Sequence, residues 1–342
     1  MEGVRQTNRS QAGAVPLTEL FIADLADHGA LSPALRADIA AAQHYATASK
    51  SLATLRAYAS DWRIYLAWCD EHRLAPMPAS AEQVAVFIAR QAETGTAVST
   101  LVRRIAAIGH HHKLAGHTPP TARDGAGRLS EVMAGIRSEH GRPPKRKRAA
   151  RARILVEMLA SCEGDTLRPL RDRAILALGM AAALRRSEIV ALDVGDLQFR
   201  DEGVDVFIAR SKTDQDRSGA TIPVPAGSRL KPVAHVRAWL EASGVVEGPL
   251  FRRLTRHDEL TEGRMSDRAI ARLIQRAAAD VGLTPGQYGG HSLRAGFLTD
   301  AAHAGATIPK MQDISRHKTV AILLDYVRSA EMYEDHAGAS FL

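Results

Sequence analysis

Five short segments in the second half of the chain carry side chains that can act on a phosphate ester. Their sequences are AALRRSEIVAL, ARSKTDQ, GHSLRAGF, SRHKT and LLDYVR. Arginine binds phosphate oxygens through paired hydrogen bonds, histidine and lysine donate or move protons, and tyrosine can serve as a nucleophile. The candidate residues in these segments are Arg185, Glu188, Lys212, His291, Arg294, His317 and Tyr326.

Each of these residues has an ordinary structural explanation when it is taken alone. Arg185 and Glu188 are three positions apart on a predicted helix, a spacing typical of surface ion pairs. Tyr326 is less ordinary, because it lies roughly 110° from the centre of the apolar stripe of its predicted helix. That stripe consists of Val320, Leu323, Leu324 and Val327. Tyr333, two turns further along in a polar tail, is the rival nucleophile.

The length of the chain and the distribution of its charge indicate how many domains it has and which partners it could bind. Its 342 residues suggest roughly two domains, and the formal net charge is +7. Residues 48–150 carry sixteen basic and eight acidic residues, whereas 1–47 carry three and five, and 151–342 carry twenty-six and twenty-five. This concentrated excess fits a nucleic-acid surface and a solvated basic surface equally well.

Several other classes are disfavoured by composition. The longest apolar run, residues 175–184, is too short to span a bilayer, and the first residues do not resemble a signal peptide. Two distant cysteines, Cys69 and Cys162, make no disulfide framework, so we expect a reducing, cytoplasmic environment. His110, His111 and His112 point about 100° apart on a helix and cannot converge on one metal ion.

Hydrophobic periodicity predicts four segments. Residues 1–47 form a partly helical extension, 48–140 a helical domain, 141–153 a basic linker, and 154–342 a second domain. In the first domain we expect helices near 55–69, 81–93 and 98–111, the second of them capped by Ser80 with Gln83. In the second domain, alternating residues at 204–209 and 221–224 predict a β-hairpin with its tip at 211–219.

Two amphipathic helices and the linker are candidates for contact with DNA, although ordinary solvated helix faces remain the alternative. Arginine can recognise guanine, and serine and threonine hydroxyls can hold phosphates. The candidate DNA-binding residues are Arg56, Ser60, Arg63, Ser99, Thr100, Arg103, Arg104, Lys113, Lys145, Arg146, Lys147, Arg148 and Arg253.

The ordered set of candidate catalytic residues resembles the active site of the tyrosine recombinase/integrase family. The pattern His291-x-x-Arg294 and the nine-residue step from His317 to Tyr326 both fit that family. The resemblance to its Cre-like members extends over most of residues 50–342. Arg316 departs from the family pattern, because the family often has glycine immediately before the histidine that corresponds to His317.

The resemblance implies a fold and a chemistry. The fold is mainly α, a two-domain clamp with an all-helical core DNA-binding domain and an α-rich catalytic domain carrying a small antiparallel β-sheet or hairpin. Tyr326 would attack phosphorus and form a 3′-phosphotyrosine, and Lys212 would protonate the departing 5′ oxygen. Arg185, Arg294, His291 and His317 would stabilise the phosphate charge, and Glu188 would orient them. No cofactor, metal ion or ATP is expected.

The resemblance also implies partners. Four protomers would bind two double-stranded DNA sites, each an inverted repeat, and exchange strands through a Holliday junction, with the residues after Tyr326 docking on a neighbour. The free protein would be a monomer without membrane contact, of bacterial, phage or plasmid origin and nucleoid-associated when bound. The alternatives are a type IB topoisomerase, a telomere resolvase, and a non-catalytic DNA-binding protein of the same fold.

Overall fold

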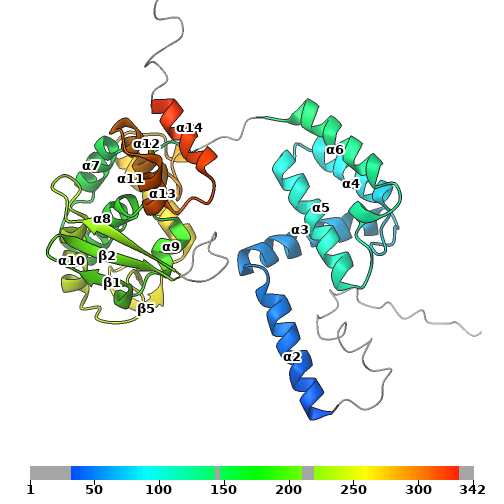
Figure 1. Ribbon diagram of the computed structural model, residues 1–342, viewed down its shortest axis with the longest axis horizontal. Helices are drawn as coiled ribbons and strands as arrows, with labels where there is room; N and C mark the ends of the chain where they lie inside the picture. The colour runs from blue at the N-terminus through cyan, green and yellow to red at the C-terminus, as the bar shows by residue number, and fades with distance from the viewer. Residues whose placement is uncertain (1–31, 143–146, 210–218, 331–342) are drawn as a thin grey trace, which may run out of the picture. The chain divides into compact units, whose positions relative to one another are not determined.

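The computed structural model describes residues 32–142, 147–209 and 219–330 (Figure 1). The chain falls into two compact units that divide between Pro144 and Lys145. Both are mainly helical, with small antiparallel sheets in the second, which confirms the predicted fold class. Among the described residues, no helix is long and apolar enough to cross a membrane.

The first unit is built from helices. These are α2 (Pro33–Ala48), α3 (Leu52–Glu71), α4 (Ala81–Glu93), α5 (Val98–Leu114), the 3-10 turn η1 (Pro120–Ala122) and α6 (Ala126–His140). The Ser80 hydroxyl accepts the backbone N–H of Gln83 at 3.1 Å, so α4 begins where its cap predicts. Trp62, Tyr65 and Phe87 lie in a core that α3, α4, α5 and α6 share.

The second unit surrounds the buried helix α8. In chain order it contains α7 (Ala152–Ser161), α8 (Leu167–Ala181), α9 (Arg186–Ala191), η2 (Val194–Asp196), β1 (Leu197–Phe199), β2 (Gly203–Ile208), β3 (Ala220–Pro225), α10 (Pro232–Ser243), β4 (Arg252–Leu254), β5 (Leu260–Arg264), α11 (Asp267–Asp280), η3 (Pro285–Gln287), α12 (Ser292–His303), α13 (Ile308–Ser315) and α14 (Val320–Ala330). Helix α14 runs beside α12 and α13 (Figure 1).

The predicted hairpin strands are present, within a larger sheet. Strands β2 and β3 pair antiparallel with Val206 opposite Ile222, and the side chains of Val204, Val206 and Ile208 are buried. Strand β1 adds a third strand that the alternation did not reveal, because three residues are too few for a period of two to show. The predicted tip, including Lys212, lies almost wholly within residues 210–218, outside the described residues.

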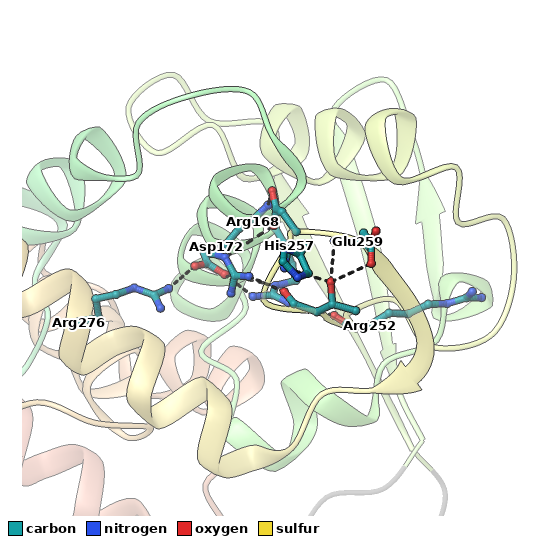
Figure 2. Close-up of polar contacts among 9 residues, drawn as sticks. Arg168, Asp172, Arg252, His257, Glu259 and Arg276 are labelled. Carbon is teal, nitrogen blue, oxygen red and sulfur yellow. Dashed lines mark hydrogen bonds and ion pairs between the residues drawn. The ribbon is translucent and has the colours of Figure 1, made fainter.

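A second hairpin, β4–β5, is attached to the helices by charged side chains (Figure 2). On α8, the Arg171 guanidinium donates to the Arg252 carbonyl at 3.1 Å and to Asp172 Oδ1 at 3.0 Å. Arg276 extends from α11 to the other oxygen of Asp172. Arg168 donates to the carbonyl of Thr255 in the turn at 2.8 Å. Two arginines of α8 therefore bind backbone carbonyls of the hairpin, and the buried Asp172 carboxylate holds one of them in place, while Leu254 and Leu260 pack against the core.

Candidate active site

The predicted catalytic residues that the structure describes lie at the starts of two helices, in one connection and on a third helix of the second unit. Arg185 is the N-cap residue of α9, and His291 is the N-cap residue of α12. Arg294 lies in the first turn of α12, His317 in the short connection between α13 and α14, and Tyr326 on α14.

Arg185 and Glu188 form a closed local unit rather than a loose surface pair. Glu188 Oε2 accepts the backbone N–H of Arg185 at 2.8 Å, and Oε1 accepts the Arg185 guanidinium at 2.6 Å. The Glu188 carboxylate is 1% exposed. Because this geometry caps the start of α9, the same residues that begin the helix also fix the direction of the Arg185 side chain.

Arg294 is the most deeply buried cation of the site. It has no exposed surface, and its guanidinium donates to the Ala183 carbonyl at 2.7 Å. Its other terminal nitrogen lies 3.3 Å from the His317 ring nitrogens. Burial, together with the nearby charges of Arg185 and Arg316, lowers the pKa of Arg294 to about 9, so the guanidinium remains charged at neutral pH.

The two histidines of the site are neutral at pH 7. Burial first, and then the charges of Arg294 and Arg185, lower the pKa of His317 to about 4. Ser315 Oγ lies 2.9 Å from His317 Nδ1, which orients the ring. The side chain of His291 is exposed at its edge, but partial burial, Arg294 and Arg185 lower its pKa as well. A neutral imidazole keeps one N–H donor and one acceptor.

Tyr326 is half-buried, and its position differs from the simple helical-wheel expectation. Its ring packs against the small apolar cluster of α12, α13 and α14 that contains Leu298 and Leu323. Val320, which the predicted stripe placed in the core, is 41% exposed. The phenol nevertheless lies within electrostatic reach of Arg294, because its negative charge would raise the Arg294 pKa. The ring is therefore anchored by aliphatic contacts while its oxygen belongs to the cationic site.

Arg316 belongs to this site, although the sequence marked it only as a departure from a family pattern. Its guanidinium donates to Glu188 Oε2 at 2.8 Å and to the Ile314 carbonyl at 2.8 Å. Its backbone is left-handed, with φ of 57°. That conformation explains why glycine is common at the position, and the adjacent His317 was the only local signal that could have identified it.

The candidate DNA-binding residues of the first unit do not all lie on its surface. Arg56, Arg63, Ser99 and Lys113 are exposed, and Ser60 and Thr100 are half-buried. Arg103 is exposed, but its guanidinium is paired with the buried Asp61 at 2.7 Å. Arg104, predicted on the outward face, is instead buried against Gln91 and Asp61. Adjacent helical residues point about 100° apart, and the charge of Asp61 draws Arg104 inward.

The remaining candidates lie in or near the second unit. Lys147 and Arg148 are exposed and lie beside η3, where the backbone N–H of Arg148 donates to the Gln287 carbonyl at 2.8 Å. Arg253 is exposed on β4. Lys145 and Arg146 lie outside the described residues.

The three adjacent histidines of α5 have structural roles. His111 stacks on Trp62 with ring centroids 4.6 Å apart. His112 is fully buried, where Nε2 accepts the backbone N–H of Ala79 at 2.9 Å. In the described part of the chain, no three His, Cys, Asp or Glu side chains are grouped to hold a metal ion.

Comparisons with known proteins agree with the predicted resemblance. The model of the phage integrase family matches residues 151–332. The chain is 34% identical to an integrase/recombinase xerD homolog of Selenomonas ruminantium, over 84% of this chain and 85% of that protein. It is 27% identical to recombinase cre of Escherichia phage P1, over 79% and 82%. The crystal structure of XerH site-specific recombinase bound to palindromic difH substrate shares the fold, with a TM-score of 0.57, 14% identity, and coverage of 77% of this chain and 73% of that one.

Proposed function

The chain belongs to the phage integrase family of tyrosine site-specific recombinases, and we propose that it cuts and rejoins duplex DNA through a covalent bond to Tyr326. The observation that carries this proposal is the convergence of Arg185, Arg294, His317 and the Tyr326 phenol from segments far apart in the sequence. Guanidinium groups arranged in advance stabilise the charge that develops on a phosphate under attack.

The proposed reaction is an in-line displacement at phosphorus. The Tyr326 oxygen forms the new P–O bond, the bond to the 5′ oxygen breaks, and the product is a 3′-phosphotyrosine with a free 5′-hydroxyl. The phenol, whose ordinary pKa is about 10, must lose its proton, and His291 and His317 are neutral and able to accept one. The departing oxygen takes a proton from Lys212. A 5′-hydroxyl then attacks the phosphotyrosine and restores the phosphodiester.

Access to Arg294 sets a condition on this mechanism. Because Arg294 has no exposed surface, a phosphate oxygen reaches its guanidinium only after the neighbouring groups shift. Its Nε, buried without a hydrogen-bond partner among the described residues, is a donor that a phosphate would satisfy. Active-site contacts commonly tighten only when substrate binds. We therefore expect DNA binding to rearrange the connection that carries His317.

The proposed partners follow from charge and from relatives. The XerH structure is described as bound to a palindromic substrate. The basic excess of residues 48–150 supports a DNA-binding role for the first unit and for the basic residues 145–148 of the linker, and we assign catalysis to residues 154–342. We propose that four protomers pair two inverted-repeat sites and exchange strands through a Holliday junction, with the residues after Tyr326 linking neighbours. Failure of the protein to pair two bound sites in a sizing assay would contradict this assembly.

A covalent trapping experiment tests the proposed function. The full chain would be incubated with nicked duplex fragments tiled across the DNA that flanks its gene, and denaturant-resistant protein–DNA adducts would be isolated and sequenced. A nick beside the cleavage point lets the short 5′ strand diffuse away, so the adduct accumulates.

We expect one enriched site with wild-type protein, no adduct with Tyr326→Phe, and an adduct with the matched control Tyr333→Phe. Retention of the adduct in Tyr326→Phe would assign the nucleophile elsewhere. Specific binding without any wild-type adduct would favour a non-catalytic DNA-binding protein. Relaxation of supercoiled DNA without recombination between sites would favour a topoisomerase.

A further inference from the structure

Arg316 contacts Glu188, a residue of the candidate site that is far from it in the sequence. We propose that Arg316 is a positioning residue: it holds the Glu188 carboxylate in place, and Glu188 in turn fixes Arg185 in the orientation that meets the phosphate. This inference rests on the proposed function, because it concerns how the same site is organised.

The hydrogen bonds connect Arg316 to Arg185 through one carboxylate. Glu188 Oε2 accepts both the Arg316 guanidinium and the Arg185 backbone N–H, each at 2.8 Å. The other oxygen, Oε1, accepts the Arg185 guanidinium at 2.6 Å. A carboxylate with both oxygens engaged cannot rotate without breaking at least one of these bonds. The direction of the Arg185 side chain therefore depends on where Arg316 holds Glu188.

The contacts of Arg316 indicate that it does not bind the phosphate itself. Its side chain is 9% exposed, and one terminal nitrogen donates to the carbonyls of Ile314 and Ala182 at 2.8 and 3.4 Å. The other terminal nitrogen donates to Glu188. Both terminal nitrogens are thus directed at acceptors within the protein. The guanidinium joins the end of α8, the start of α9 and the connection that carries His317.

The backbone of Arg316 supports a role for its side chain. Left-handed φ values are unfavourable for residues other than glycine, so an arginine at φ 57° is costly unless its side chain offsets the strain. The ion pair with a carboxylate that is 1% exposed supplies such an offset. A glycine here would relieve the backbone and remove the ion pair together, whereas a lysine would keep the backbone strain and a positive charge, so the two variants together separate the contributions.

Electrostatics gives the inference a pH-dependent consequence. Burial raises the pKa of Glu188, but Arg316 and Arg185 lower it by more, so the carboxylate stays ionised. Arg294 from α12 also interacts with Glu188, and Asp196 lines the same small cavity. Without Arg316 the Glu188 pKa rises, and its carboxyl becomes protonated at a less acidic pH. A protonated carboxyl loses part of its capacity to accept from Arg185.

The test compares rates of adduct formation on the nicked duplex recovered by covalent trapping. Arg316→Gly is expected to slow adduct formation about tenfold to a hundredfold, the scale of a small misplacement of a catalytic group. Its affinity for the same duplex should stay close to that of the wild type, and Arg316→Lys should recover part of the rate. The matched control is Arg73→Gly, an exposed arginine with φ of 54°, which should react at the wild-type rate.

A double-mutant comparison and a pH profile separate positioning from a general structural effect. If Arg316 acts through Glu188, Arg316→Gly combined with Glu188→Gln should be no slower than the slower single variant. As the pH is lowered, the rate of adduct formation by Arg316→Gly should begin to fall at a higher pH than the rate of the wild type. When Glu188→Gln is present in both proteins, this difference should disappear.

Other results would contradict the positioning role of Arg316 or the proposed function. Multiplying effects in the double variant, or wild-type rates in Arg316→Gly, would overturn the positioning role while the wild-type adduct still upholds the proposed function. A thermal midpoint lowered in Arg316→Gly and in Arg316→Lys alike, with equal loss of rate and unchanged pH profiles, would make the residue merely structural. Absence of any wild-type adduct would remove the proposed function itself.

Discussion

Single histidines in both units are held neutral by their surroundings, with different consequences. Burial and three nearby arginines lower the pKa of His317 to about 4, which leaves it as a proton acceptor or a neutral donor in the candidate site. His111 also has its pKa lowered to about 4, but by burial first and by His110 and His112 next, beneath Trp62. The first arrangement suits the proposed reaction, whereas we expect the second to make the stability of the first unit sensitive to acid.

We expect His111→Phe to make the first unit less sensitive to acid. Between pH 6.5 and about 4 the unfolded chain binds a proton at His111 while the folded chain does not, so the free energy of unfolding falls as the pH falls through this window. The loss is smaller than the roughly 3 kcal/mol that the whole pKa difference would give, because His111 is only partly buried and solvent screens its charge. Phenylalanine keeps the stacking on Trp62 and also removes His111 Nε2, which is buried without a hydrogen bond among the described residues.

The measurement is denaturant unfolding of wild type and variant at pH 7 and pH 5. The difference in unfolding free energy should grow in favour of His111→Phe at the lower pH. His72→Phe is the control, because His72 is exposed at the end of α3. A difference independent of pH would show that His111 does not cause the acid sensitivity.

The order of the residue types selected the candidate residues through a family resemblance, whereas the environments of those residues could not be predicted. Arg185, His291, Arg294 and His317 could be selected because a specific order of chemically competent residues is rare by chance. Arg316 and Arg104 could not, since their positions depend on carboxylates distant in the sequence. A helical wheel assigns a side chain to a face but does not reveal a buried acid such as Asp61 behind it.

At the scale of elements, predictability followed length. Helices of ten or more residues with apolar stripes, such as α4, and the alternating strands β2 and β3 were predicted near their observed bounds. The three-residue strands β1 and β4 were not, because so short a segment shows no period. The β4–β5 hairpin contributes Leu254 and Leu260 to the core, but these two positions form no periodic pattern, and arginines of α8 also bind its backbone carbonyls.

The carboxylate of Asp172 should therefore be critical for the stability of the second unit. It is 4% exposed and accepts from Arg171 and Arg276. We expect Asp172→Asn to lower the free energy of unfolding by about 3 kcal/mol, because it leaves the buried Arg171 guanidinium without its counter-charge. Denaturant unfolding followed by the fluorescence of Trp239, the only tryptophan in this unit, would measure the change.

Asp165→Asn provides the matched control for this prediction. Asp165 pairs with Arg173 at 3.3 Å just before α8, but its side chain is 96% exposed, so its replacement should change stability little. Equal effects of the two substitutions would mean that burial of the Asp172 charge does not matter. In that case the other contacts of the hairpin, such as those of Leu254 and Leu260 with the core, must hold it.

At the scale of the whole molecule, the uneven distribution of charge is the property that a sequence reports directly. The basic excess lies in residues 48–150, while residues 151–342 carry nearly equal numbers of basic and acidic residues. Several arginines of residues 151–342 form ion pairs inside the unit. The first unit also contains internal pairs, those of Arg103 and Arg104 with Asp61. The exposed cations of α3 and α5 that have no such acid beside them are the stronger candidates for contact with phosphate.

The proposed DNA contacts predict a specific dependence on salt. Each phosphate neutralised by a cation releases counterions, so the logarithm of the binding constant falls linearly with the logarithm of salt concentration. Arg63→Ala and Lys113→Ala, both at exposed positions, should each reduce the magnitude of that slope by about one. Arg128→Ala should leave it unchanged, because Arg128 is paired with Glu82 at 3.2 Å on the α4–α6 side of the unit. Binding titrations with the DNA site recovered by covalent trapping, at several salt concentrations, would give the slopes. If Arg128→Ala changed the slope as much as Arg63→Ala does, the DNA-binding face would have been assigned to the wrong helices.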